Sequence, residues 1–226
     1  MLLTPLFDRI YIAGQAEKGA TLGKATRATM ASLHKTLEFL GRSDSDIVQI
    51  KSFLSPMTSV AEAQRELSAF FGERPVPPSV WVEWTSPLIE IELIAWGGPK
   101  KEGSKVEFLT PPGMTTSPVY SRVARVNSNR LIYLPGLFAR QSADGAGEVI
   151  DIFSQVDETL KEVGSDRRHL VKATYYCSTN DASLKLNELR PKYYDPQRPP
   201  AASKAMVKET GRVERGLTID LIAVPK

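Results

Sequence analysis

The sequence repeats itself at a fixed interval. Residues 41–53 (GRSDSDIVQIKSF) align with residues 164–176 (GSDRRHLVKATYY), which lie 123 positions further along the chain. The same offset pairs Gln64 with Asn187. A constant offset that runs through predicted helices and loops indicates that a whole folding unit is present twice. The chain is therefore expected to fold as two tandem copies of one domain.

The domain limits follow from the repeat and from local composition. Domain 1 is expected over residues 1–98 and domain 2 over residues 117–226, with a linker over residues 99–116 that is rich in Gly, Pro, Lys and Thr. The first copy begins too late in the pattern to include its opening strand. That strand is missing or is supplied elsewhere, and residues 105–109 (KVEFL) of the linker are one candidate.

Each copy shows the same order of predicted elements. Met30, Leu33, Leu37 and Leu40 recur at helical spacing, which predicts an amphipathic helix. Strands are predicted over residues 47–54 and 170–177, and an alternating hairpin closes each copy. Because strands and helices alternate, we expect an α/β (α+β) fold in which two helices cover one face of a mixed sheet in each domain. The other face of each sheet must also be covered.

Composition is that of an ordinary globular protein, with 42% hydrophobic and 24% charged residues. No apolar run approaches the length of a membrane span and the start lacks the features of a signal peptide, so a cytoplasmic protein without membrane contact is expected. The net charge is only +3, and the sequence contains no run of four basic residues, which argues against nucleic acid as a partner. One cysteine, Cys177, and two histidines are too few for a typical zinc site, so neither metal nor cofactor is expected.

Short motifs in both copies carry a family resemblance. The first copy contains residues 10–15 (IYIAGQ) and 89–95 (IEIELIA), and the second contains residues 131–136 (LIYLPG) and 219–223 (IDLIA). In their order and spacing these motifs resemble the RidA/YjgF family, also called the L-PSP endoribonuclease family. The resemblance implies a chorismate-mutase-like fold in which three domains join their sheets into a closed barrel. Because each chain would supply two domains, the implied assembly is a homotrimer of six domains; the alternative is a monomer in which the two domains pack on each other.

The resemblance also implies a site in the cleft between adjacent domains. Family members that hydrolyse enamines and imines hold the substrate carboxylate with the arginine of a Pro-x-Arg motif, and a glutamate positions water. Both copies depart from this pattern, because Pro77-Pro78-Ser79 and Pro200-Ala201-Ala202 contain no arginine. Glu90 matches the glutamate and is the candidate catalytic residue, although its alternating surroundings also suit a half-exposed strand.

Five further residues are candidates for substrate binding. Tyr120 matches a family tyrosine, and Asn187 and Gln64 match its asparagine in the two copies. Lys204 lies two positions after the missing arginine on a predicted strand, so it shares that face and could present an ammonium group there. Its counterpart Trp81 would narrow the pocket or stack on a flat ligand. The alternative for Lys204 is a solvent-facing residue with a packed stem.

We therefore expect a divergent Rid-family protein that binds a small metabolite, anionic or imine- or carbonyl-like, in clefts between domains, with weak or altered hydrolytic activity. The alternative is an active enamine or imine deaminase in which Lys204 replaces the arginine and Glu90 activates water. That alternative requires domains 1 and 2 to meet at one cleft. An endoribonuclease is a third hypothesis, which no histidine pair or basic groove in the sequence supports.

Overall fold

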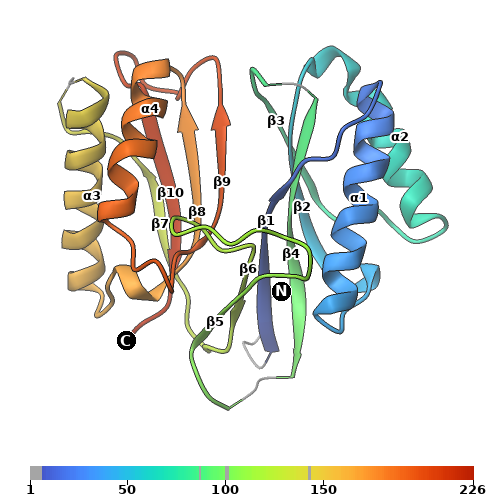
Figure 1. The fold of residues 1–226 in the computed structure, drawn as a ribbon, viewed down its shortest axis with the longest axis horizontal. Coiled ribbons are helices and arrows are strands. Elements are labelled where there is room, and N and C mark those ends of the chain that lie inside the picture. The colour runs from blue at the N-terminus through green and yellow to red at the C-terminus, as the bar shows by residue number, and fades with distance from the viewer. Residues whose placement is uncertain (1–6, 87, 100–101, 142–143) are drawn as a thin grey trace.

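The arrangement is two β-sheets that face each other, with a pair of helices on the outer side of each (Figure 1). The computed structural model describes residues 7–86, 88–99, 102–141 and 144–226. Within these ranges, no helix is long and apolar enough to cross a membrane.

The two units share one topology. The first unit consists of β1 (Phe7–Gln15), α1 (Leu22–Phe39), β2 (Ile47–Leu54), α2 (Val60–Phe71), β3 (Ser79–Glu83) and β4 (Ile89–Pro99). The second consists of β7 (Ile132–Leu137), α3 (Gly145–Glu162), β8 (Leu170–Cys177), α4 (Asn180–Leu189), β9 (Ala201–Met206) and β10 (Leu217–Ala223). The strand orders β3-β2-β4-β1 and β9-β8-β10-β7 correspond element by element. In both, the first pair is parallel and the others are antiparallel. This confirms the predicted fold, two mixed sheets that each carry two helices. The hairpin predicted to close each copy is wrong, because β2 lies between β3 and β4, and β8 lies between β9 and β10.

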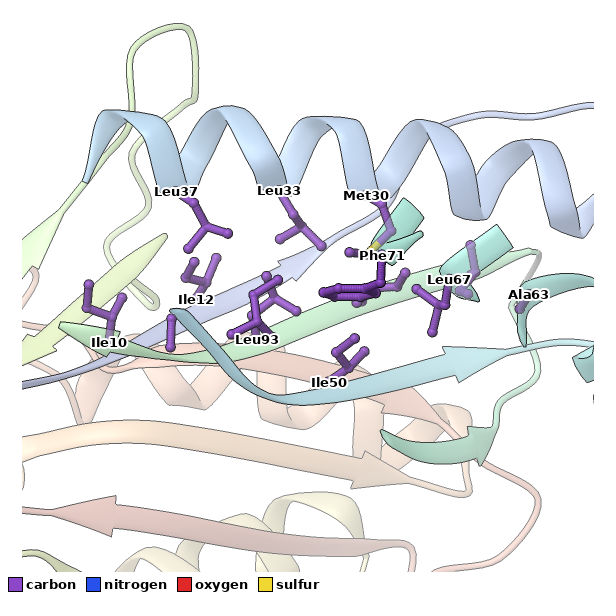
Figure 2. Close-up of a cluster of buried hydrophobic side chains, with 14 of the residues drawn as sticks. Ile10, Ile12, Met30, Leu33, Leu37, Ile50, Ala63, Leu67, Phe71 and Leu93 are labelled. Carbon is purple, nitrogen blue, oxygen red and sulfur yellow. The ribbon is translucent and has the colours of Figure 1, made fainter. Parts of the chain in front are cut away.

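The helices are held to their sheets by apolar side chains at helical spacing. Figure 2 shows Met30, Leu33 and Leu37 of α1 pointing toward the sheet, where Ile12 and Leu93 lie. All five side chains are at most 1% exposed. The Thr21 hydroxyl caps α1 by accepting a hydrogen bond from the Lys24 N–H. Truncating a leucine in such a layer to alanine typically costs about 2–5 kcal/mol, so this stripe fixes where α1 lies on the sheet.

The opening strand of the first sheet comes from the start of the second copy. Strand β6 (Val123–Val126) pairs antiparallel with β1, with Tyr11 opposite Ala124. Strand β5 (Val106–Leu109) pairs with the far side of β6 and forms the edge of the same sheet. The candidate segment of the linker is therefore a strand, but it lies one position further out than the missing strand. The chain crosses from the first unit to the second through this hairpin, so the first sheet contains a strand from the start of the second copy.

The inner faces of the two sheets cover each other. Tyr11, Val171 and Ala201 belong to one buried apolar cluster formed by both units. Next to it, the carboxylate of Glu92 on β4 bonds the ammonium of Lys172 on β8 at 2.5 Å. The sheet face that the helices leave open is thus covered within the same chain.

Candidate functional site

A cavity of about 600 Å³ opens where the two units meet. Its lining comes from the first unit (Gly14 and Glu90), from the segment before β6 (Met114 and Tyr120) and from β9 of the second unit, at Lys204. A second cavity of about 660 Å³ lies at the amino-terminal ends of α3 and α4, beside the 208–216 loop, and none of the predicted site residues line it. The interdomain cavity is therefore the candidate site.

Glu90 reaches the cavity from β4, directly over the backbone of Gly14. A Cβ atom added at Gly14 would lie 2.0 Å from Oε1 of Glu90, so the carboxyl group occupies the space that a side chain there would need. Burial raises the pKa of Glu90 to about 7, and the negative charge of Glu92 adds to the effect. A hydrogen bond with Ser203 opposes the shift in part. The result is a carboxyl group that exchanges its proton near neutral pH, as a general acid or base must.

Lys204 faces the cavity from β9, which is one of the two edge strands of the second sheet. Its Nζ donates to Oγ of Ser183 at 3.0 Å and to Oδ1 of Asn187 at 3.1 Å, both on α4. Partial burial lowers the pKa of Lys204, and the positive charge of Arg190 contributes in the same direction. Asn187 thus contacts Lys204 and is not part of the cavity lining, whereas Tyr120 lines it directly.

Two arginines that are not among the sequence-based candidates also line the cavity. Arg190 opens the short 3₁₀ helix Arg190–Lys192 after α4 and is 8% exposed. Within the described part of the chain its buried Nε has no hydrogen-bond partner, and its guanidinium lies 5.0 Å from the centre of the Tyr175 ring. The guanidinium of Arg122 bonds the carbonyl and hydroxyl oxygens of Thr115 at 3.1 and 3.0 Å. Positive charge therefore reaches this cleft from loops and turns, although the strand position of the family arginine holds Ala202, which also lines the cavity.

The remaining candidates lie away from this cavity. Gln64 is exposed on α2, and Trp81 on β3 packs against the core of the first unit. At the position in the second copy that matches Glu90, Thr218 donates its hydroxyl to the carbonyl of Leu137 at 3.1 Å. The structure therefore gathers Glu90, Tyr120 and Lys204 around one cleft, with Asn187 behind Lys204, and leaves Gln64 and Trp81 outside it.

Comparisons with known proteins match part of the chain to one family and to several solved structures. Residues 114–224 match the sequence profile of the endoribonuclease L-PSP family. No curated protein matches the chain. A solved member of the YjgF family from Neisseria meningitidis is 24% identical over 54% of this chain and 95% of its own, with a TM-score of 0.41. A Rid-family protein of unknown function from Yersinia pestis is 16% identical over 53% of this chain and 98% of its own, with a TM-score of 0.49. A putative endoribonuclease from Thermotoga maritima is 25% identical over 42% of this chain and 80% of its own, with a TM-score of 0.36. Through residues 114–224, the chain belongs to the endoribonuclease L-PSP family, which is the RidA/YjgF family.

Proposed function

We propose that the interdomain cavity binds a small metabolite that carries a carboxylate beside a carbonyl or imine group, and that its hydrolytic activity is weak or altered. The observation that carries this proposal is the sharing of one cavity by Lys204 and Arg190 of the second unit and Glu90 of the first. A volume of about 600 Å³ suits a small molecule.

Lys204 and Arg190 supply the positive charge for a substrate carboxylate that the arginine missing from the strand would supply. A hydrogen bond to a charged partner is worth about 1.5–3 kcal/mol, or roughly 10- to 150-fold in affinity. Arg190 offers a planar guanidinium that can hold both oxygens of a carboxylate, whereas Lys204 offers a point charge. We therefore assign the carboxylate to Arg190 and place the carbonyl or imine carbon between Lys204 and Glu90.

Hydrolysis of an imine is the second candidate function, and the pKa of Glu90 near 7 favours it. Ionised Glu90 would take a proton from water as the water oxygen bonds to the imine carbon. The same carboxyl group would return that proton to the nitrogen, which gives a carbinolamine. It would then move the hydroxyl proton of the carbinolamine to the nitrogen as the C–N bond breaks and the C=O bond forms, so ammonia leaves and a keto acid remains. This cycle needs one group that is a base and an acid at the same pH, which matches Glu90.

The endoribonuclease hypothesis has less support. The two histidines of the sequence each bond a carboxylate away from the cavity: Nδ1 of His34 lies 2.9 Å from Asp44, and Nδ1 of His169 lies 2.7 Å from Asp166. Neither lines the cavity.

Calorimetry with pyruvate tests the binding function. Wild type should bind it, and Arg190→Gln should bind at least tenfold more weakly. Arg65→Gln, on the exposed side of α2, is the matched control and should bind like wild type. No binding by wild type, or equal affinity in Arg190→Gln, would refute the proposal.

A coupled assay tests the hydrolytic function. A dehydratase that releases 2-aminoacrylate is mixed with the protein, and keto-acid formation is followed. Acceleration by wild type that is lost in Glu90→Gln supports hydrolysis, while no acceleration at stoichiometric protein excludes this chemistry.

We also propose the homotrimer of six domains. Strands β5 and β7 end their sheets, and Tyr133 on β7 is 66% exposed, which suits an edge covered by another chain. Sedimentation should give about three times the chain mass of 24.9 kDa, and a single chain mass would overturn the trimer.

A further inference from the structure

We propose that Lys204 is a nucleophile that forms a covalent imine with the carbonyl carbon of a 2-keto acid in the interdomain cavity. This inference rests on the proposed function, because it requires that the cavity binds such a metabolite. It goes further by assigning Lys204 a bond to the ligand instead of a charge contact.

The first observation is the set of partners around the Lys204 amine. Other partly buried lysines of the structure are neutralised by carboxylates: Lys51 and Lys172 both pair with Glu92. Nζ of Lys204 instead bonds two neutral oxygens, on Ser183 and Asn187, and among the described residues no carboxylate lies within ion-pair distance of it. A lysine without a counter-ion in a partly buried position is less firmly protonated than a surface lysine.

The second observation is the neighbour that faces this amine. Arg190 lines the same cavity, and its positive charge disfavours a second positive charge on Lys204. The Cys177 thiol on the neighbouring strand β8 acts in the opposite sense, but burial raises the pKa of that thiol to about 11, so it carries no charge at neutral pH. A lysine beside another cation in a partly desolvated pocket is a recognised way to obtain a neutral, nucleophilic amine.

The third observation is the acid across the cavity. The two oxygens on α4 fix the direction of the amine, while Glu90 reaches the cavity from the opposite unit. A carboxyl group with a pKa near 7 is partly protonated at neutral pH and can donate to a carbonyl oxygen. The amine, the acid and the carboxylate-binding guanidinium therefore surround one small space.

The step balances without any further reactant. The neutral nitrogen of Lys204 bonds the carbonyl carbon, and the electron pair of the C=O bond moves to oxygen, which takes a proton from Glu90. The nitrogen returns one of its own protons to Glu90. The nitrogen lone pair then expels the hydroxyl group, which takes that proton and leaves as water. The product is a protonated imine, for a net uptake of one proton.

Reductive trapping tests the inference. The full chain is incubated with pyruvate and cyanoborohydride, and adducts are located by intact mass and peptide mapping. We expect one adduct per chain, on Lys204. Lys204→Arg keeps a long basic side chain but has no nucleophilic amine, so trapping should fall at least tenfold while calorimetry still detects pyruvate binding. Lys185→Arg, whose lysine is paired with Glu188 on the same helix α4, should be trapped like wild type.

The results separate the inference from the proposed function. Pyruvate binding without an adduct, or equal trapping in Lys204→Arg and wild type, would overturn the covalent role and leave the binding function intact. Failure of wild type to bind pyruvate in calorimetry and to be trapped would overturn both.

Discussion

Replacing Glu92 by glutamine should destabilise the whole chain, because this carboxylate joins the two units. Glu92 is 5% exposed, and its oxygens lie 2.5 Å from Nζ of Lys172 and 3.4 Å from Nζ of Lys51. Burial alone raises the pKa of Glu92, but the two ammonium groups outweigh it and leave that pKa below the usual 4.5. Glu92→Gln keeps the shape but leaves the buried ammonium of Lys172 without its carboxylate partner, and the partly buried Lys51 keeps only the nearby charge of Asp220. Breaking a buried pair in this way costs about 3–5 kcal/mol, against a total stability of about 5–15 kcal/mol.

Urea unfolding measures this effect. We expect a lower midpoint with an unchanged slope, which is the sign of reduced stability. The control is Lys51→Met/Glu92→Leu/Lys172→Met, which removes all three charges and should recover much of the loss, since apolar replacement of a whole buried ion network is often neutral. Because the folded pKa of Glu92 is lowered, its contribution is present above pH 4.5 and is lost as the pH falls through the folded value. A Glu92→Gln protein within about 1 kcal/mol of wild type, or a triple variant as unstable as the single, would refute the reasoning.

Three further predictions concern the site and its surroundings. Gly14→Ala places a Cβ 2.0 Å from Oε1 of Glu90, so the carboxyl group must move and keto-acid formation from 2-aminoacrylate should fall at least tenfold; an unchanged rate would contradict this placement. Glu90 has a folded pKa raised to about 7, so the folded protein holds this proton more tightly than the unfolded chain does. Wild type should therefore lose about 3 kcal/mol relative to Glu90→Gln as the pH rises from 4.5 to above 7, and parallel urea curves at all pH values would exclude the shift. The Cys177 thiol is 0% exposed with a pKa raised by burial to about 11, so a thiol reagent should modify it only as fast as the protein unfolds, and rapid modification in native buffer would show an open core.

Regular elements were predictable because their signals are local. The strands predicted over residues 47–54 and 170–177 coincide with β2 and β8, and the Met30 to Leu40 stripe is buried under α1. Apolar periodicity and the constant offset are both properties of neighbouring residues, so the sequence reveals them. The choice of Glu90, Tyr120 and Lys204 as candidates rested on motif positions, and the fold brings all three to one cavity.

Long-range pairing was not predictable in the same way. Val123–Val126 reads as a strand in any sheet, and nothing local states that it pairs with β1 of the first unit. Arg190 was not predicted, because a replacement for the family arginine was expected on the strand that carries the Pro-x-Arg motif. Arg190 lies only three residues after the candidate Asn187, but outside that strand. Gln64 and Trp81 were predicted as site residues because they are the first-copy counterparts of Asn187 and Lys204. In the fold, Glu90 of the first unit meets β9 of the second unit at the cavity, whereas Gln64 and Trp81 lie outside it.

A crystal structure of the protein soaked with pyruvate tests most directly whether the two units build one site. We predict density for the ligand between the units, with its carboxylate on Arg190, its central carbon bonded to Nζ of Lys204 and Glu90 within hydrogen-bond distance. Ligand density only at another surface, for example beside Gln64 and Trp81, or an interdomain cavity that stays empty at saturating pyruvate, would contradict the shared site.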